Sequence, residues 1–261
     1  MNLQEVTIGE SVSTIGDYAF GGCTSLATAH FNAVNCTAAY AVFYTNDGNG
    51  SEMTLIIGEN VTRIPDNAFC YARRLTSIAI PNSVTYVGSN AFMVCDNVQT
   101  IVIGNGVTHI GHGAFQSCNN VQEVTIGESV DTIGDGAFWN CPALNVVRFN
   151  AVNCTAMQTT NNNDYFSVFS SGIFGENPAI TTVILGSNVT RIPDYSFKNT
   201  SNLQRLIIPA SVTYIGDYAF YENNISMLNL DEITNLTTIG NGSFYKNSLT
   251  SVVFPDSLTS I

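Results

Sequence analysis

Apolar side chains return along the chain at a fixed interval, and this interval indicates a repeat architecture. Its clearest marker is a phenylalanine that recurs every 23 residues, at Phe69, Phe92, Phe115 and Phe138. Other apolar slots keep their spacing from this phenylalanine in each unit. Because one unit is too short to bury these side chains by itself, we predict that the units stack as the coils of a solenoid.

Each unit contains a short stretch in which apolar and polar residues alternate, as in a half-buried strand. In the first such stretch we expect Val6 and Ile8 to face inward and Glu5 and Thr7 to face solvent. Glycine or proline then ends the strand, and we treat the two as equivalent there. This alignment predicts about eleven coils. Their central strand residues are Ile8, Phe31, Ile57, Ile80, Ile103, Ile126, Phe149, Leu185, Ile208, Leu230 and Phe254.

The residues after each strand predict a short helical turn on the opposite, convex side of the coil. An aspartate such as Asp17 or Asp66 precedes the dipeptide Ala-Phe or its equivalent, and aspartate is favoured at the start of helices. The expected fold is therefore an α/β leucine-rich-repeat solenoid, horseshoe-like. Its short parallel strands lie on the concave face and its short helical turns on the convex side.

A longer repeat contains several copies of the short one. The segment LQEVTIGESV at residues 3–12 returns as VQEVTIGESV at residues 121–130. We therefore predict an internal duplication, approximately 1–118 and 119–247, within one continuous domain over residues 1–261. The chain begins and ends inside the repeat, so we expect it to be a fragment of a longer protein.

Two coils are longer than the others. The central strand residues are 26 apart between Phe31 and Ile57 and 36 apart between Phe149 and Leu185. The extra residues must leave the stack, and the polar run in the second coil predicts an exposed loop over Met157–Gly172.

The repeat unit resembles the BspA-type leucine-rich repeat. One copy, at residues 80–92, reads IPNSVTYVGSNAF, and the likeness covers nearly the whole chain. The resemblance implies a right-handed solenoid in a bacterial surface or secreted protein. It also implies roles in attachment to host matrix proteins or in contact between cells. The family leaves the ligand open, because the repeat specifies the scaffold.

Composition narrows the range of partners. Only 11% of the residues are charged, against about 25% in an average globular chain. The formal net charge of -12 disfavours nucleic acid and anionic lipid. No apolar run approaches the roughly 20 residues that span a bilayer, so we expect no direct membrane insertion.

The sequence offers few residues for catalysis or metal binding. His109 and His112 are close enough in sequence to share a metal, but both occupy variable slots. We therefore predict no metal, no cofactor and no enzymatic activity.

The cysteines follow the repeat. Four of them occupy one inward slot, where we expect the thiol to donate to main-chain carbonyls of neighbouring coils. These residues are Cys23, Cys95, Cys118 and Cys141, followed in later coils by Asn177, Thr200, Asn223 and Asn247. Cys36, Cys70 and Cys154 lie outside this slot, and their redox state stays open.

The outward column of the predicted sheet carries an unusual number of aliphatic residues. A solvent-facing sheet normally carries polar ones, so this column is a candidate docking surface. The candidate binding residues are Ile56, Ala79, Val102, Thr125, Arg148, Ile184 and Ile207. The alternatives are that β-propensity alone places these residues there, or that the loop Met157–Gly172 covers them.

A second set of residues is aromatic and is expected on the convex and lateral sides. Aromatic residues are enriched at interfaces, but we favour packing of the rings over the turns. The set comprises Tyr18, Tyr71, Tyr195, Tyr218, Tyr221, Tyr245 and Trp139.

These observations lead to two hypotheses of function. In the first, the chain is a non-catalytic binding or adhesion module, extracellular or at the cell surface. It engages a host or bacterial surface protein or a glycan through the concave sheet. In the second, the chain is a structural spacer that presents other domains and has no ligand of its own. The oligomeric state stays open.

Overall fold

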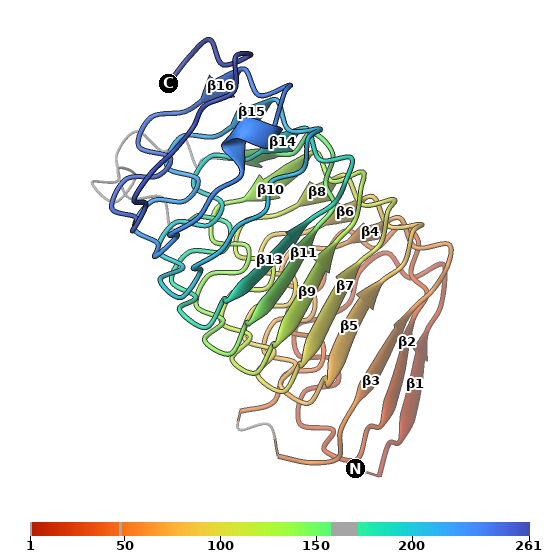
Figure 1. Cartoon of the computed structure of the whole chain (residues 1–261). Coiled ribbons are helices and arrows are strands. Elements are labelled where there is room, and N and C mark those ends of the chain that lie inside the picture. Colours follow the sequence, from red (N-terminus) through yellow and green to blue (C-terminus); the bar gives the residue numbers. More distant parts are fainter. Residues whose placement is uncertain (1, 47–48, 158–171) are drawn as a thin grey trace, which may run out of the picture.

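The chain forms a stack of coils whose strands are all parallel (Figure 1). The computed structural model describes residues 2–46, 49–157 and 172–261. The stack is a parallel-strand solenoid of about nine turns. Each regular coil contributes a four-residue strand to one face and a shorter strand to a second face. We call these the long-strand face and the short-strand face.

The long-strand face contains two sheets, ordered β1-β2-β3 and β13-β11-β9-β7-β5. The second sheet crosses the boundary between residues 118 and 119, because β7 pairs with β9. The long strands are β1 (Glu5–Ile8), β2 (Thr28–Phe31), β3 (Thr54–Ile57), β5 (Ser77–Ile80), β7 (Thr100–Ile103), β9 (Glu123–Ile126), β11 (Val146–Phe149) and β13 (Thr182–Leu185).

The short-strand face also contains two sheets, ordered β12-β10-β8-β6-β4 and β14-β15-β16. The apolar pattern predicted no strand at these residues, because strands of two or three residues leave little alternation to detect. The short strands are β4 (Arg63–Ile64), β6 (Tyr86–Val87), β8 (His109–Ile110), β10 (Thr132–Gly134), β12 (Thr155–Met157), β14 (Arg191–Ile192), β15 (Tyr214–Ile215) and β16 (Thr238–Ile239).

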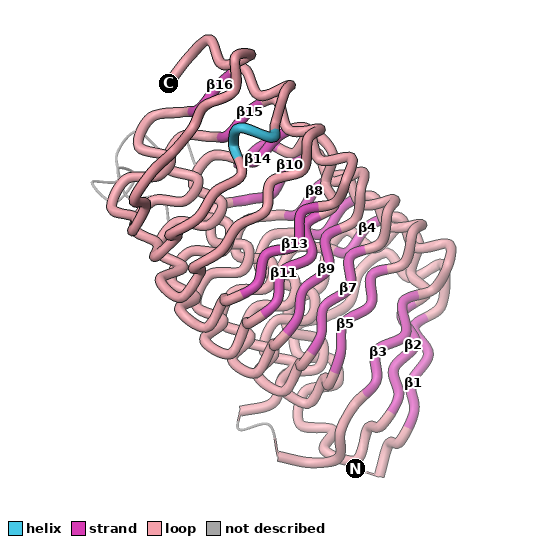
Figure 2. Tube along the Cα trace, viewed as in Figure 1, coloured by secondary structure: helices cyan, strands magenta, loops and turns pink. Residues whose placement is uncertain are grey.

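The predicted helical turns are wrong, and so is the α/β class: the described residues fold almost without helix (Figure 2). Their only helix is the 3-10 turn η1 (Leu230–Glu232). Around Phe92, both Asn90 (φ 53°) and Val94 (φ 59°) have left-handed backbone. Other coils repeat this pair of positions, and a left-handed residue stops a right-handed helix from continuing. The chain therefore rounds each phenylalanine as two successive turns.

The aspartates expected to cap these helices bind the next coil instead. The Oδ1 atom of Asp66 accepts the main-chain N–H of Ser89 at 3.0 Å. Asp194 accepts the N–H of Asp217 at 3.2 Å in the same way. These carboxylates therefore form a ladder between coils.

The expectation of about eleven coils is too high. The last three central strand residues, Ile208, Leu230 and Phe254, lie outside the strands, and Leu230 begins η1. The apolar pattern continues through these coils while the pairing of the long strands does not, so counting slots overestimates the regular turns. The right-handed sense and the horseshoe curvature stay predictions.

The core is a column of phenylalanine rings. Neighbouring rings stack with centroids 5.4 Å apart for Phe92 and Phe115 and 5.0 Å apart for Phe115 and Phe138. All three side chains are fully buried. Stacked pairs of this kind contribute about 0.5–1.5 kcal/mol beyond the burial of their area, so the column ties successive coils together.

The inward slot after each phenylalanine bonds to main-chain carbonyls, as predicted. The Cys118 thiol donates to the Phe92 carbonyl at 3.3 Å, and the Asn223 amide donates to the Phe197 carbonyl at 2.8 Å. All seven cysteines, including the three outside this slot, are buried free thiols.

The long-strand face is interrupted at two places: between β3 and β5, and after β13. In uninterrupted coils the strand-ending residue donates its N–H to the previous coil. Gly58 donates to Phe31 and Gly186 to Phe149, each at 2.9 Å. The coils that follow the two interruptions carry Pro81 and Pro209 in this slot, and proline has no N–H. Glycine and proline are therefore not equivalent here.

Candidate binding surface

The sheet from β5 to β13 aligns five of the predicted binding residues in one row. The register pairs Ala79 with Val102 and Val102 with Thr125. It then pairs Thr125 with Arg148 and Arg148 with Ile184. These five side chains therefore form a continuous outward column across five strands, as the sequence alignment predicted.

The other two predicted residues lie beyond the ends of this row. Ile56 belongs to β3, where it pairs with His30 across the sheet β1-β2-β3. Ile207 follows β13 in a segment that forms no strand. The two interruptions thus separate Ile56 and Ile207 from the central column.

Both ends of the surface expose aliphatic side chains. The exposed fraction is 43% for Ile56, 48% for Val102, 40% for Ile184 and 59% for Ile207. The centre is polar, because Arg148 forms an ion pair with the neighbouring Glu123. The surface therefore combines two aliphatic ends with a charged middle.

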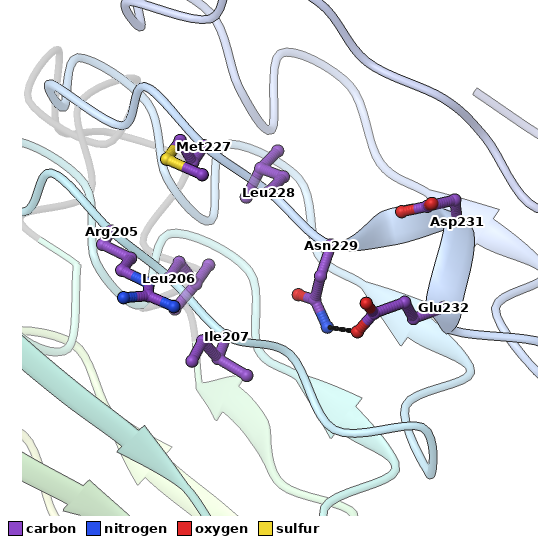
Figure 3. A pocket seen from close by; sticks show the side chains of 8 residues that line it. All are labelled: Arg205, Leu206, Ile207, Met227, Leu228, Asn229, Asp231 and Glu232. Atoms are coloured by element: carbon purple, nitrogen blue, oxygen red, sulfur yellow. Dashed lines mark hydrogen bonds between the residues drawn. The ribbon is translucent and has the colours of Figure 1, made fainter.

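A groove of about 560 Å³ opens at the second interruption, between β13 and the segment 205–207. Its lining includes Ile184, Leu185, Arg205 and Ile207. We call it the Ile184–Ile207 groove. A smaller hollow of about 290 Å³ adjoins it, shares Arg205 and Ile207, and ends at η1 (Figure 3).

The groove exists because the two coils do not pair. Among the described residues no main-chain hydrogen bond joins 181–185 to 205–209. On its other side, the main chain of Ile208 bonds to the side chain of Asn229 in the following coil, at 3.0 and 3.1 Å. Leu185 is consequently half-buried, whereas the equivalent Ile126 is fully buried.

Arg205 differs from the other basic residues of the chain. Each of the other seven Lys and Arg side chains contacts a carboxylate, a main-chain carbonyl or an aromatic ring. Arg205 is exposed at the edge of the groove. Its guanidinium makes no such contact with any described residue.

The short-strand face carries a stack of planar groups that the sequence analysis missed. The Arg63 guanidinium lies 3.8 Å from the ring centre of Tyr86, and the Tyr86 ring stacks on His109 at 4.6 Å. The duplication repeats the first contact, with Arg191 at 3.7 Å from Tyr214. Recognising a second ladder of strands would have placed these residues side by side.

The histidines considered for a metal lie on different features. His109 belongs to this stack, where burial and then the charge of Arg63 lower its pKa, with Asp66 acting in the opposite direction. Its Nδ1 atom lies 2.8 Å from the Thr132 hydroxyl. Within the described residues, no three His, Cys, Asp or Glu side chains come together as metal ligands would.

The tyrosines predicted to pack over the turns contact one another. Tyr195 stacks on Tyr218 at 5.2 Å, and Tyr221 stacks on Tyr245 at 5.0 Å. The Trp139 Nε1 atom donates to Glu176 at 2.9 Å. Most of the predicted loop Met157–Gly172, which we considered as a cover for the sheet, lies outside the described residues.

No described helix is long and apolar enough to cross a lipid bilayer.

The stacked parallel coils define a leucine-rich-repeat solenoid. The chain belongs to the BspA-type leucine-rich-repeat family: the family description "BspA type Leucine rich repeat region" matches in six copies, at residues 1–49, 43–167 and 167–261. No curated protein matches the chain.

A solved bacterial structure shares the fold. A leucine-rich repeat protein from Bacteroides ovatus is 24% identical, with a TM-score of 0.59 over 98% of this chain and 70% of that chain. A leucine rich cell surface protein from Faecalibacterium prausnitzii is 22% identical, with a TM-score of 0.39 over 99% of this chain and 78% of that chain.

Proposed function

We propose that this chain is a non-catalytic binding module of a secreted or cell-surface protein, which engages a protein or glycan partner through its long-strand face. The name of the Faecalibacterium prausnitzii protein, a cell surface protein, supports the location. The net charge of -12 supports a partner other than nucleic acid.

The observation that carries the proposal is the exposed aliphatic surface of the long-strand face. Ile184 and Ile207 flank a groove in a sheet whose outward side chains would ordinarily be polar. Exposed apolar surface of this kind marks binding sites in soluble proteins. Repeat solenoids offer such surfaces as extended binding faces.

The buried thiols support a role without catalysis. A reactive cysteine needs an accessible thiolate. Burial raises the pKa values of Cys118, Cys141 and Cys154 well above the ordinary value, and their thiols donate to main-chain carbonyls. These cysteines therefore serve packing.

The test is binding of the fluorescently labelled chain to epithelial cell monolayers and to reconstituted extracellular matrix. The variant replaces Ile56, Val102, Ile184 and Ile207 by Ser. The matched control replaces Thr14, Thr155 and Thr238 by Ser on the short-strand side. We expect saturable binding that the first variant loses and the control keeps. Equal binding by all three chains would refute the long-strand face as the site.

The spacer hypothesis rests on a different observation, the column of stacked phenylalanine rings that runs through the coils. Such a column suits a rigid support. This hypothesis predicts no saturable binding of the isolated chain on either surface, so the same experiment distinguishes the two functions.

A further inference from the structure

We infer that the Ile184–Ile207 groove takes an extended peptide that has aliphatic side chains and a carboxylate at one end. This inference rests on the proposed function and narrows it to one partner chemistry at one part of the long-strand face. Three independent features of the groove support it: its main-chain edges, its aliphatic walls and its free guanidinium.

The first feature is a pair of unpaired strand edges. In a parallel sheet, alternate residues direct both N–H and C=O toward the same neighbouring strand. In the uninterrupted coils, the residues equivalent to Val183 and Leu185 bond to the following coil. Here the described residues form no main-chain bond across the groove. A peptide that lies along the edge of β13 can supply these missing donors and acceptors, as in strand addition.

The second feature is the aliphatic lining. Ile184 and Ile207 are exposed by 40% and 59%, and Leu185 contributes to the wall of the groove. Alternate side chains of an extended peptide point the same way. A peptide with aliphatic residues at alternate positions therefore covers these side chains while its main chain pairs with β13.

The third feature is Arg205. It lines the groove on the side opposite β13, and among the described residues it has no carboxylate, carbonyl or ring contact of the kind that the other basic side chains have. A guanidinium binds a carboxylate through two parallel hydrogen bonds. A carboxylate at the end of the peptide would therefore satisfy Arg205.

The duplication provides an internal comparison. At the first interruption, Ser77 and Ala79 occupy the places of Arg205 and Ile207. That site therefore lacks both the cation and the large aliphatic side chain. Its strands also remain partly joined, because Met53 bridges Leu75. The first interruption serves as the matched control for the second.

The experiment uses the full chain and the fluorescein-labelled peptide GSVLV in fluorescence anisotropy. Three forms of the peptide are compared: the free acid, the C-terminal amide, and the free acid with N-methylated main chain. We expect saturable binding of the free acid. We expect each of the other two forms to bind at least about tenfold more weakly, because one loses the carboxylate and the other the main-chain donors.

Variants then assign the contacts to residues. R205S should lower the affinity for the free acid to the level of the amide and leave the affinity for the amide unchanged. I207D should abolish the binding of both forms. T155S, on the short-strand face, should bind like the wild-type chain, and circular dichroism confirms that every variant is folded.

Two outcomes would overturn the inference: no saturable binding of the free acid, or equal affinity for the free acid and the amide. If the peptide fails but the isoleucine and valine substitutions abolish binding to cells or matrix, the proposed function stands and the peptide inference falls. If the chain binds neither cells, matrix nor peptide, the proposed function and the peptide inference are both refuted.

Discussion

Two interrupted coils occupy equivalent places in the longer sequence repeat of this solenoid, and these two copies have different properties. Pro81 and Pro209 occupy the strand-ending slot in the coils that follow the two lengthened ones. Neither proline has a main-chain N–H to donate to the previous coil. In the first copy a buried arginine, Arg74, ties the coils together, and Ser77 and Ala79 line the sheet. In the second copy a groove opens beside Arg205 and Ile207.

The two copies differ in the arginine that each carries beside the interruption. The Arg74 guanidinium donates to the carbonyls of Cys23, Thr24 and Ser51 at 2.8–2.9 Å. The second copy has Asn202 at this position, and Asn202 is exposed. The first copy therefore uses its arginine for stability, while the second leaves an arginine at the surface.

The largest effect is expected from replacing Arg74 in the first copy. Arg74→Met removes three hydrogen bonds that join the coils, and one such bond contributes about 1 kcal/mol. We expect a loss of roughly 3 kcal/mol in the free energy of unfolding, measured by urea denaturation. Asn202→Ala is the matched control and should change stability by less than about 0.5 kcal/mol. Similar losses in both variants would show that the copies do not differ in this way.

The next effect concerns binding. R205S/I207A gives the second copy the side chains of the first, and we expect it to lower the affinity for the GSVLV free acid at least about tenfold. Adding S77R/A79I to that variant should restore part of the binding, because it gives the first copy the cation and the aliphatic wall. Fluorescence anisotropy measures both. Unchanged affinity in R205S/I207A would place the site elsewhere.

A smaller effect is expected at the proline itself. Pro209→Gly supplies an N–H that can donate to Leu185, and one such bond contributes about 1 kcal/mol. Glycine also increases the entropy of the unfolded chain, which offsets roughly 0.4–1 kcal/mol. We therefore expect little change in stability but slower hydrogen exchange at residue 209 than at a solvent-exposed amide, together with weaker peptide binding. Fast exchange at this amide would show that the loss of the donor does not cause the interruption.

The smallest effect is a pH dependence confined to the first copy. The pKa of His109 is lowered by burial and by Arg63, so the unfolded chain takes up the proton more readily than the folded chain. Its contribution to stability is therefore present above the ordinary pKa of about 6.5 and declines as the pH falls below it. The strand residue paired with Tyr214 in the second copy is Thr238, which does not titrate.

His109→Gln should remove this part of the pH dependence. Urea denaturation at pH 7 and pH 5 should show a smaller loss of stability in the variant than in the wild-type chain. An identical loss in both chains would mean that the stack on the short-strand face does not sense pH.

Much of this structure could be predicted from the 23-residue interval. The burial of Phe92 and the bonds of Cys118 follow from their slots, since each slot has the same neighbours in every coil. The continuous outward column from Ala79 to Ile184 follows from the same alignment. These features depend on contacts between successive coils, which the repeat itself encodes.

The remaining features depend on properties that apolar spacing does not report. The helical turns were predicted from an aspartate before the phenylalanine, but left-handed residues such as Val94 exclude them. Ile207 was placed in a strand because its slot is regular, yet its segment forms no strand with β13. The free guanidinium of Arg205 could be recognised only once its neighbours were known.

The most direct test of the difference between the two copies is a methyl NMR titration of the chain with the GSVLV free acid. Isoleucine δ1 methyl groups report separately on Ile56 at the first interruption and on Ile184 and Ile207 at the second. We predict that the resonances of Ile184 and Ile207 shift saturably while that of Ile56 does not move. Equal shifts at all three, or no shift at Ile184 and Ile207, would contradict the account.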